Sequence, residues 1–470
     1  MFSKLFLLVF VILSLSAHAS LEGASRIYSQ GSVSLSGYQR MIIELVEDEY
    51  YFSAVPWVKD LLVKSNGTVD PSVDRAIDEI LTRTGVKPFE SLPEEVLRRS
   101  KSGHIRYILG KKLFKAGEST EALEVLNTTE FEDRAFPFIA NLKGVIYSDL
   151  ERYAEAVTQF KDCIRYSERL MGSVKTNIHK QQYLMNRDYC VAGVARVEFS
   201  EKKYVKSGST YLDIPKESPV WPEILFEEAW ASYYRKNYNR TLGKLISYKA
   251  PVFDFIFNPE IEVLKGLTYL KMCLYDDAKH TVDDFYNNYE NPSKRLREIL
   301  KSRGKDYRYY YTLLADYEGK HASPLPILDS ILRSVGKDAT LVEMKQALSQ
   351  ALSEYNRLRK QGNNSLKTNL IHNIKTLLDE YRTIIGAYVH ASVVSKYADL
   401  YTAFQGMSYI KLEVLAQRKE KLYRSDNIPG QKRGDVKYIK RNDKQYFWNF
   451  NGEFWADELG DYVFALRSEC

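Results

Sequence analysis

The stretch LGKKLFKAGESTEALEVL (109–126) recurs in the same register as KGVIYSDLERYAEAVTQF (143–160). In both stretches a glycine is followed twelve positions later by an alanine and, four positions after that, by a large apolar residue. A third stretch, KGLTYLKMCLYDDAKHTV (265–282), has the same internal spacing. Self-similarity at a fixed period is typical of repeat architectures, so the sequence predicts stacked copies of one supersecondary unit.

This pattern resembles the tetratricopeptide repeat (TPR), a helix–turn–helix unit whose period matches the step from Gly110 to Gly144. The resemblance implies that these two glycines lie where the first helix of a pair crosses closely over the second, with no room for a side chain. Ala122 and Ala156 would lie at the same crossing, on the second helix. The low content of glycine (24) and proline (14) also disfavours a turn-rich all-β protein. We therefore expect an all-α, TPR-like α-solenoid.

Stacked helix pairs bury their apolar faces against one another and form a curved surface with a concave groove. In TPR proteins the first helix of each pair lines this groove, and the resemblance implies the same role for three sets of positions here. The predicted groove residues are His104, Tyr107, Lys111, Phe114, Phe138, Asn141, Val145, Glu260, Val263, Leu267, Leu270 and Lys271. The last set, from Glu260 onward, is apolar for a surface. It predicts either a face covered by another segment of the chain or a docking site for a partner helix or peptide.

Composition and pattern divide the chain into five segments. These are a signal peptide (1–19), N-terminal helical hairpins (20–100), the TPR-like solenoid with insertions (101–292), a long helical hairpin or coiled-coil-like region (293–425) and an aromatic cap (426–470). Asp70-Pro71 and the run 91–95 are helix-start signals in the second segment. Within the solenoid, 190–212 and 227–245 are interpreted as degenerate repeats, with insertions expected near 172–188 and 214–221.

Apolar residues in the fourth segment are spaced alternately by three and four, first over 341–358 and again over 370–388. This heptad-type spacing, interrupted by Gly362-Asn363-Asn364, predicts an antiparallel helical hairpin that turns at 362–365. The second helix is expected to extend to about Tyr423. A hairpin packed within the chain is the favoured interpretation, and a dimeric coiled coil is the alternative.

The C-terminal stretch, QYFWNFNGEFWADELGDYVFALRSEC (445–470), is dense in aromatic side chains. A short β-hairpin turning at Asn451-Gly452 and a helix over 457–468 are predicted. This segment is expected to cap the solenoid or the helical hairpin, since repeat arrays need covered ends. The alternative is a patch that binds carbohydrate or peptide, formed by Phe447, Trp448, Phe450, Phe454 and Trp455.

The start of the chain (1–19) predicts export. Lys4 precedes an apolar run, LFLLVFVIL (5–13), and the segment ends in Ala17-His18-Ala19, a pattern typical of a cleavable signal peptide. The run is shorter than the ~20 apolar residues that span a bilayer. We expect the mature protein in the periplasm or outside the cell, where disulfides are permitted. Sequence does not choose among the three pairings of Cys163, Cys190, Cys273 and Cys470, and the default for Cys163 and Cys273 is a small buried apolar residue.

The formal net charge of +6 is concentrated between Arg418 and Lys444, a stretch that contains ten Lys or Arg residues and four Asp or Glu residues. Export makes a nucleic-acid partner unexpected, and no later segment is apolar enough to span a membrane. None of the motifs of zinc sites, P-loops or serine hydrolases is present, so no catalytic residue, metal or cofactor is expected. The sequence favours a protein that binds other proteins over an enzyme.

The segments 214–278 and 450–470 are also similar to secreted TPR proteins of gliding and predatory bacteria, some of which are associated with the adventurous gliding-motility machinery. This resemblance implies a periplasmic scaffold in an envelope-spanning complex of the motility or transport type, with other envelope proteins as partners. Two alternatives are a subunit of an enzyme that acts on the cell wall and an adaptor that binds peptidoglycan through the C-terminal aromatic residues.

Overall fold

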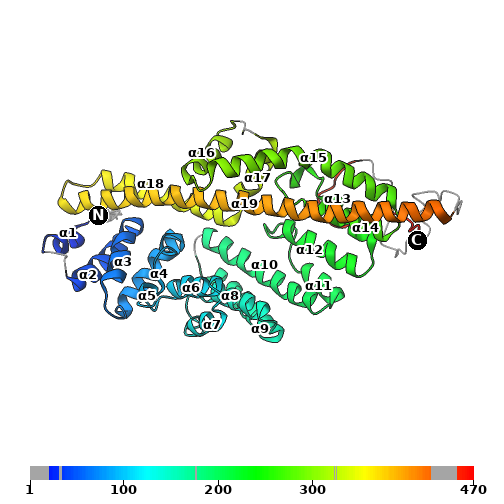
Figure 1. The fold of residues 1–470 in the computed structure, drawn as a ribbon. Helices are drawn as coiled ribbons and strands as arrows, with labels where there is room; N and C mark the ends of the chain where they lie inside the picture. The colour runs from blue at the N-terminus through cyan, green and yellow to red at the C-terminus, as the bar shows by residue number, and fades with distance from the viewer. Residues whose placement is uncertain (1–20, 31–33, 175–176, 322, 324, 425–451) are drawn as a thin grey trace, which may run out of the picture. The chain divides into compact units, whose positions relative to one another are not determined.

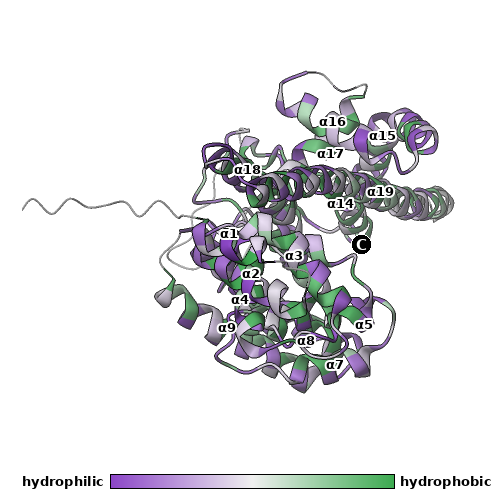
Figure 2. Ribbon diagram, turned by 90° about the vertical axis from the view of Figure 1, so that its left-hand side faces the viewer, coloured by the Kyte–Doolittle hydropathy of each residue, from purple (hydrophilic) through white to green (hydrophobic). Residues whose placement is uncertain are grey.

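The computed structural model describes residues 21–30, 34–174, 177–321, 323, 325–424 and 452–470, and every regular element among them is a helix (Figure 1). Figure 2 shows hydrophobic and hydrophilic residues mixed on most of the helices. None of the described helices is both long and apolar enough to cross a membrane. The predicted signal peptide lies outside the described residues. The chain forms two compact units, and both draw on its second half.

Unit 1 consists of the described residues up to Ser102 together with Ser349–Leu378. Its helices are α1 (Glu22–Ser29), α2 (Leu35–Glu47), α3 (Tyr51–Lys64), α4 (Pro71–Thr84), η1 (Lys87–Phe89) and α5 (Glu94–Leu97), with the end of α18 (Ala339–Arg359) and the start of α19 (Ser365–Arg424). Helix α4 begins at Pro71, where the Asp70 side chain accepts a hydrogen bond from the Ser72 N–H. Both predicted helix starts are therefore confirmed, because α5 likewise begins inside the run 91–95.

A buried carboxylate from the second half of the chain caps helix α3. The N-cap residue of α3, Tyr50, makes no side-chain capping bond. Instead Glu354 accepts hydrogen bonds from the backbone N–H groups of Phe52 (3.0 Å) and Ser53 (2.7 Å) and from the Ser53 hydroxyl (2.6 Å). The first N–H groups of a helix have no partner within it, and a negative charge is favourable at that end. Glu354 thus ties α18 to α3 within unit 1.

Unit 2 consists of Gly103–Leu348 and the residues from Asp379 onward. Five successive helix pairs form its first part: α6 (Gly103–Lys115) with α7 (Ser119–Asn127), α8 (Phe136–Asp149) with α9 (Tyr153–Ser173), α10 (Asn177–Ser200) with α11 (Tyr204–Tyr211), α12 (Trp221–Tyr234) with α13 (Tyr238–Ser247), and α14 (Glu260–Lys271) with α15 (Tyr275–Arg303). Helix η2 (Pro251–Phe253) precedes α14, and α16 (Tyr307–Glu318) and α17 (Pro326–Gly336) precede α18.

One residue with a positive φ stands in the turn of each of these five pairs. The turn residues are Gly117, Glu151, Lys202, Lys236 and Cys273, with φ between 56° and 87°. Seven positions before each of them lies a small residue of the first helix: Gly110, Gly144, Ala195, Ala229 and Gly266. Twelve positions after each small residue, the second helix carries a fully buried Ala122, Ala156, Ser207, Thr241 or Ala278. The five pairs therefore share one TPR-like register.

The predicted close crossing is confirmed in the first two pairs. A Cβ atom added at Gly110 would lie 2.6 Å from the Leu126 side chain, and one at Gly144 would lie 2.6 Å from the Phe160 ring. Leu126 and Phe160 are the large apolar residues that follow each glycine by sixteen positions. The absence of a side chain thus lets the second helix fill the space with an apolar residue.

The shared register locates the insertions. The step from Ala195 to Ala229 equals the step from Gly110 to Gly144, which is one period. The step from Gly144 to Ala195 is longer by half a period, and the expected insertion near 172–188 is present there as the long helices α9 and α10. The structure has no second insertion at 214–221. The step from Ala229 to Gly266 is longer than one period by only three positions, in a stretch that contains η2.

The helical hairpin predicted in the second half is formed by α18 and α19, and residues 360–364 connect them. Helix α19 has 60 residues, which corresponds to a length of about 90 Å at 1.5 Å per residue. Helix α15 continues through Pro292 to Arg303, and α16 and α17 follow before α18.

All four cysteines are paired in disulfides, Cys163 with Cys190 and Cys273 with Cys470. The default expectation for Cys163 and Cys273 as free apolar residues is therefore wrong. Cys163 is fully buried, as expected, but its partner is placed beside it by the packing of α10 against α9. The Cys273–Cys470 bond joins the turn after α14 to the C-terminal segment, at a sequence separation of 197.

We expect Gly144→Val to destabilise the protein by about 1–3 kcal/mol, because a larger side chain must displace the Phe160 ring in a packed crossing. Urea unfolding followed by circular dichroism measures the loss. Gly172→Ala is the matched control, since an added Cβ there meets no atom within 4 Å. Equal midpoints for Gly144→Val and the unchanged protein would show that this crossing is not closely packed.

The Oδ2 atom of Asp48 is buried and has no hydrogen-bond partner. Burial, followed by the Glu44 and Glu47 carboxylates, raises its pKa from 3.8 to about 6. Because the pKa is higher in the folded state, the contribution of Asp48 to stability is present below pH 3.8 and is lost as the pH rises through 6. Asp48→Asn should remove this loss of stability, because the asparagine side chain does not ionise.

The thermal midpoint of Asp48→Asn should therefore rise relative to the unchanged protein between about pH 4 and pH 7, by the equivalent of about 1 kcal/mol after allowance for solvent screening. Glu95→Gln, a substitution of an exposed acid, is the control and should show no such trend. A difference in midpoint that stays constant across this pH range would contradict the prediction.

Candidate functional site

The first helices of the pairs in unit 2 present residues at fixed distances from the small crossing residue. The predicted groove positions of α14, Glu260 and Val263, lie six and three positions before Gly266. The same positions of α12, counted from Ala229, are Glu223 and Phe226, and Trp230 follows directly after it. These five side chains line one groove with a volume of about 910 Å³.

Helix α19 and the end of α17 form the other walls of this groove. Helix α19 contributes an exposed or half-buried face that carries Ser392, Ser395, Lys396, Asp399 and Thr402. The end of α17 and the residues after it contribute Val335, Lys337 and Asp338. The groove is thus the part of the concave face that α19 borders without filling.

Aromatic side chains extend this surface toward α10. Arg196, Phe199, Tyr211, Trp230 and Tyr234 line a smaller, adjoining hollow of about 430 Å³. The ring of Tyr234, which is 48 % exposed, lies 5.5 Å from Phe199 and 5.9 Å from Trp230, measured between ring centroids. Glu227 and Trp230 line both hollows, so the acidic and the aromatic parts form one continuous surface on α10, α12 and α14.

The carboxylates of the groove differ in their partners. Glu227 is bound by the Arg196 guanidinium through two hydrogen bonds (2.9 and 2.7 Å) and by the Tyr211 hydroxyl (2.7 Å). Asp399 lies 3.6 Å from the Lys396 ammonium. Glu223 and Glu260 form no ion pair that the structure describes; Glu223 accepts only a 3.4 Å hydrogen bond from the Tyr189 hydroxyl.

Loss of solvation in the concave surface raises the pKa of both Glu223 and Glu260. Neighbouring carboxylates add to the shift, from Glu227 and Asp338 at Glu223 and from Asp399 at Glu260. Arg196 opposes it at Glu223, and a hydrogen bond with Trp230 opposes it at Glu260. Both side chains remain accessible to solvent, so a cation that enters the groove can reach them.

The predicted groove residues of α14 fall into two groups. Glu260 and Val263 line the groove, although Val263 is nearly buried because it packs against Gly406 of α19. Leu267 and Leu270 are half-buried and pack against the apolar core that α14 shares with α19. The chain itself therefore fills this part of the concave face. Lys271 is exposed at the end of the helix.

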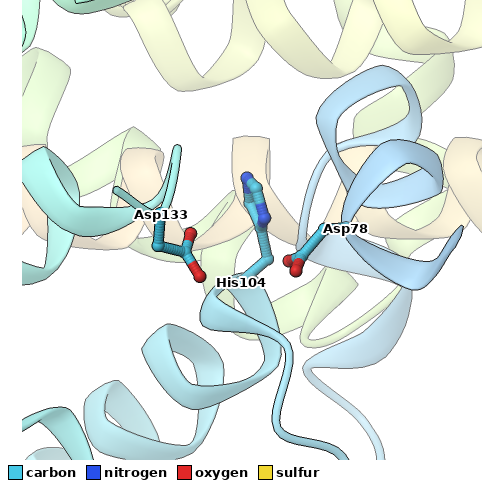
Figure 3. A group of neighbouring side chains, drawn as sticks. All are labelled: Asp78, His104 and Asp133. Carbon is cyan, nitrogen blue, oxygen red and sulfur yellow. The ribbon is translucent and has the colours of Figure 1, made fainter. Parts of the chain in front are cut away.

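The predicted residues of the first two pairs lie apart from this groove. Phe138 stacks on Tyr183 of α10 at 5.6 Å, and the Asn141 amide donates to Asn186 at 3.0 Å, while Val145 is 43 % exposed. The His104 side chain, at the start of α6, lies beside the Asp133 carboxylate, which precedes α8, with ligand atoms within 4.8 Å (Figure 3). The other predicted residues of α6, all half-buried, are Tyr107, Lys111 and Phe114.

The residues of α10, α12 and α19 that build the groove were not identified from the sequence. For α12 a signal existed, because the stretch 227–245 was interpreted as a repeat, and counting from Ala229 gives Glu223, Phe226 and Trp230. For α10 the same count from Ala195 gives only Arg196 among the lining residues. No equivalent signal marks Asp399 or Thr402, since the spacing of α19 does not show which face lies against the solenoid.

The C-terminal segment packs against α12 and α13 in place of the helix predicted over 457–468. Residues 456–461 form turns, and 462–470 have no regular structure. The Phe464 N–H donates to the Asn239 carbonyl (3.0 Å), and the Asn239 side chain bonds both the N–H and the C=O of Leu466 (3.0 Å each). Backbone groups that a helix would pair internally are thus paired with α13, which is why the helix prediction is wrong.

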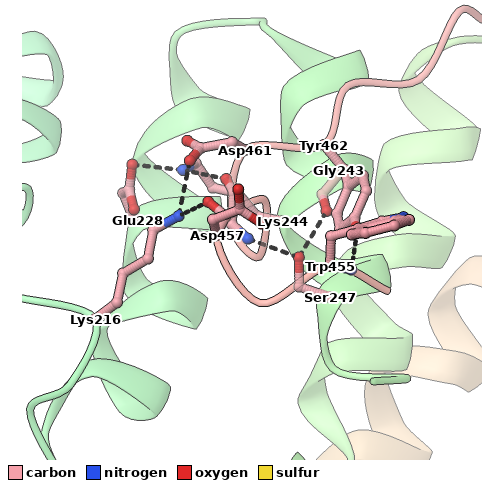
Figure 4. Close-up of polar contacts among 10 residues, drawn as sticks. Lys216, Glu228, Gly243, Lys244, Ser247, Trp455, Asp457, Asp461 and Tyr462 are labelled. Carbon is pink, nitrogen blue, oxygen red and sulfur yellow. Dashed lines mark hydrogen bonds and ion pairs between the residues drawn. The ribbon is translucent and has the colours of Figure 1, made fainter. Parts of the chain in front are cut away.

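Two further contacts fix this segment (Figure 4). The nearly buried Lys244 bonds Glu228 at 2.5 Å and the Gly460 carbonyl at 3.2 Å. The backbone of Tyr462 comes so close to Gly243 that a Cβ there would collide with its carbonyl oxygen. Of the predicted aromatic patch, Phe447, Trp448 and Phe450 lie outside the described residues, Phe454 packs near Tyr462, and Trp455 is 59 % exposed.

No protein-family model and no curated protein sequence matches the chain. Among solved structures, the crystal structure of the APC/C hetero-tetramer Cut9–Hcn1 matches with 13 % identity over 86 % of this chain and 89 % of that chain, at a TM-score of 0.24. A TM-score this low carries no argument. The TPR-like character of the fold rests on the shared register and packing of the helix pairs themselves.

We expect Gly243→Ala to release the C-terminal segment from α13, because its methyl group cannot coexist with the Tyr462 carbonyl. Limited proteolysis should then cleave within 456–469, although Cys273–Cys470 still holds the end covalently. Gly208→Ala, where the nearest atom is 3.8 Å from an added Cβ, is the control. Unchanged resistance of the segment in Gly243→Ala would contradict the packing described.

Proposed function

We propose that this chain is a periplasmic scaffold that binds other proteins and is a component of an envelope-spanning complex of the gliding-motility or transport type. The single observation that carries the binding role is the open groove on the first helices of a TPR-like solenoid. Recognition by a rigid, preformed concave surface avoids the cost of ordering a flexible site on binding. The partner would be a segment of another envelope protein.

The proposed location has two independent supports. The start of the chain (1–19) has the pattern of a cleavable signal peptide. All four cysteines are paired in disulfides, and disulfides form and persist in oxidising compartments such as the periplasm. The Cys273–Cys470 bond would hold the C-terminal segment on the solenoid after export.

A second candidate is an adaptor that binds envelope glycan through the C-terminal aromatic residues. Its support is Trp455, which is large, flat and 59 % exposed. The amphipathic ring of tryptophan is suited to stack on a sugar or a peptide. The neighbouring Phe454 packs inward, so this candidate rests on one described side chain, and the groove is the stronger basis.

The scaffold proposal is tested with a photo-crosslinking amino acid placed at position 223, 260 or 399 of the exported full-length protein in its native cells. Irradiation should give a discrete crosslinked protein from these groove positions. Position 168 on α9, an exposed glutamate away from the groove, is the control. If no groove position gives a protein adduct that the control lacks, the scaffold proposal fails.

A further inference from the structure

We infer that the groove between α12, α14 and α19 binds a peptide segment that carries arginine or lysine side chains among apolar residues. The inference rests on the proposed scaffold function and names the chemistry of the partner. It is drawn from three features of the groove: the excess of carboxylates on its walls, their spacing, and the aromatic surface that continues from it.

The lining of the groove has a negative formal charge, whereas the whole chain has a positive one. The lining contains five carboxylates (Glu223, Glu227, Glu260, Asp338 and Asp399) against two lysines, Lys337 and Lys396, which gives a formal charge of −3, or −2 when Arg196 of the adjoining hollow is counted. The whole chain has a formal net charge of +6. The net charge of the whole chain would therefore not attract a cationic ligand, and the negative charge is a local property of the groove.

The cations nearest to the groove do not neutralise the two exposed glutamates. The Arg196 guanidinium is occupied by both carboxylate oxygens of Glu227. Lys396 lies beside Asp399 on α19. Glu223 and Glu260 remain accessible to solvent. The pKa of each is raised by partial loss of solvation and by neighbouring carboxylates, although Arg196 lowers the pKa of Glu223 in part. A bound guanidinium or ammonium would offset both effects.

The carboxylates are spaced for a segment and not for a single ion. Among the described residues, no three of the groove carboxylates offer oxygen atoms within 4.8 Å of one another. Glu223 and Glu260 lie on different helices, six positions before the crossing residue of each. At this position α12 and α14 therefore present one carboxylate each, which suits a segment with several cations better than one metal ion.

The aromatic surface of Phe199, Trp230 and Tyr234 favours the same ligand. A guanidinium or ammonium over an aromatic face is attracted by the ring, by about 0.5–1 kcal/mol at an exposed site. The aliphatic stems of Arg and Lys and neighbouring apolar residues can cover the remaining ring surface. Anionic glycans and anionic lipids are disfavoured, because they would bring negative charge against the groove carboxylates.

The test uses the purified, disulfide-bonded full-length protein and a short fluorescein-labelled peptide with arginines among leucines and serines. Fluorescence anisotropy should show saturable binding that weakens as salt is added. The same peptide with citrulline in place of arginine keeps the shape and removes the charge, and it should bind at least about tenfold more weakly. A glutamate version should not bind.

Two variants of groove residues test whether the arginine peptide binds in the groove. The double substitution Glu223→Lys, Glu260→Lys should weaken binding of the arginine peptide at least about tenfold. Thr402→Lys adds a cation to the α19 wall without removing any carboxylate and should have the same direction of effect. Glu168→Lys on α9 makes the same charge change away from the groove and should leave affinity unchanged. All four positions are exposed, and circular dichroism verifies folding.

Failure of the arginine peptide to bind, equal binding of the citrulline peptide, or full affinity in both groove variants would overturn the inference. Preferential binding of purified peptidoglycan or anionic vesicles at the groove would overturn it as well. If groove positions still crosslink to a protein in cells, only the cationic character of the partner is refuted. If they do not, the scaffold function itself is refuted.

Discussion

The close crossing of paired helices at a small residue is the constraint on which the solenoid of unit 2 depends. Gly110 and Gly144 on the first helices allow the second helices to approach closely, and in all five pairs a residue with positive φ seven positions after the small residue reverses the chain. Four of the five turn residues are not glycine, although side chains other than glycine are disfavoured in that conformation. Packing at the crossings stabilises these turns, so crossing and turn support each other.

This register also determines the surface. In α12 the positions six and three before the crossing residue and one after it line the groove, and in α14 the positions six and three before it do so. In α12 these positions carry Glu223, Phe226 and Trp230, which are charged or aromatic, whereas in α14 Leu267 meets the core. Helix α19 covers the apolar part of the face and leaves the acidic and aromatic part open. The groove is therefore the part of the concave face that helix α19 borders but leaves open.

Long-range contacts complete both units. Glu354 caps α3 in unit 1, and the C-terminal segment pairs its backbone with Asn239 and α13 in unit 2. The Glu354 contact pairs buried polar groups, which cost more when unpaired than the bond itself contributes, and the Asn239 contacts pair half-buried ones. The Cys273–Cys470 disulfide holds the second of these contacts covalently. In this way segments from the second half of the chain complete the packing of helices from the first half in each unit.

The sequence by itself determined the local structure: the helix pairs, the glycine crossings of Gly110 and Gly144, the turn between α18 and α19, and the groove role of Glu260. These features repeat or lie within one or two helices, so their spacing is visible along the chain. Tertiary structure alone decided that Leu267 and Leu270 pack against the core to which α19 contributes, that the C-terminal segment pairs with α13 instead of forming a helix, and which cysteines bond. The physical reason is that helical periodicity specifies which face of a helix is apolar, but the partner of that face is chosen by packing between segments that lie far apart along the chain.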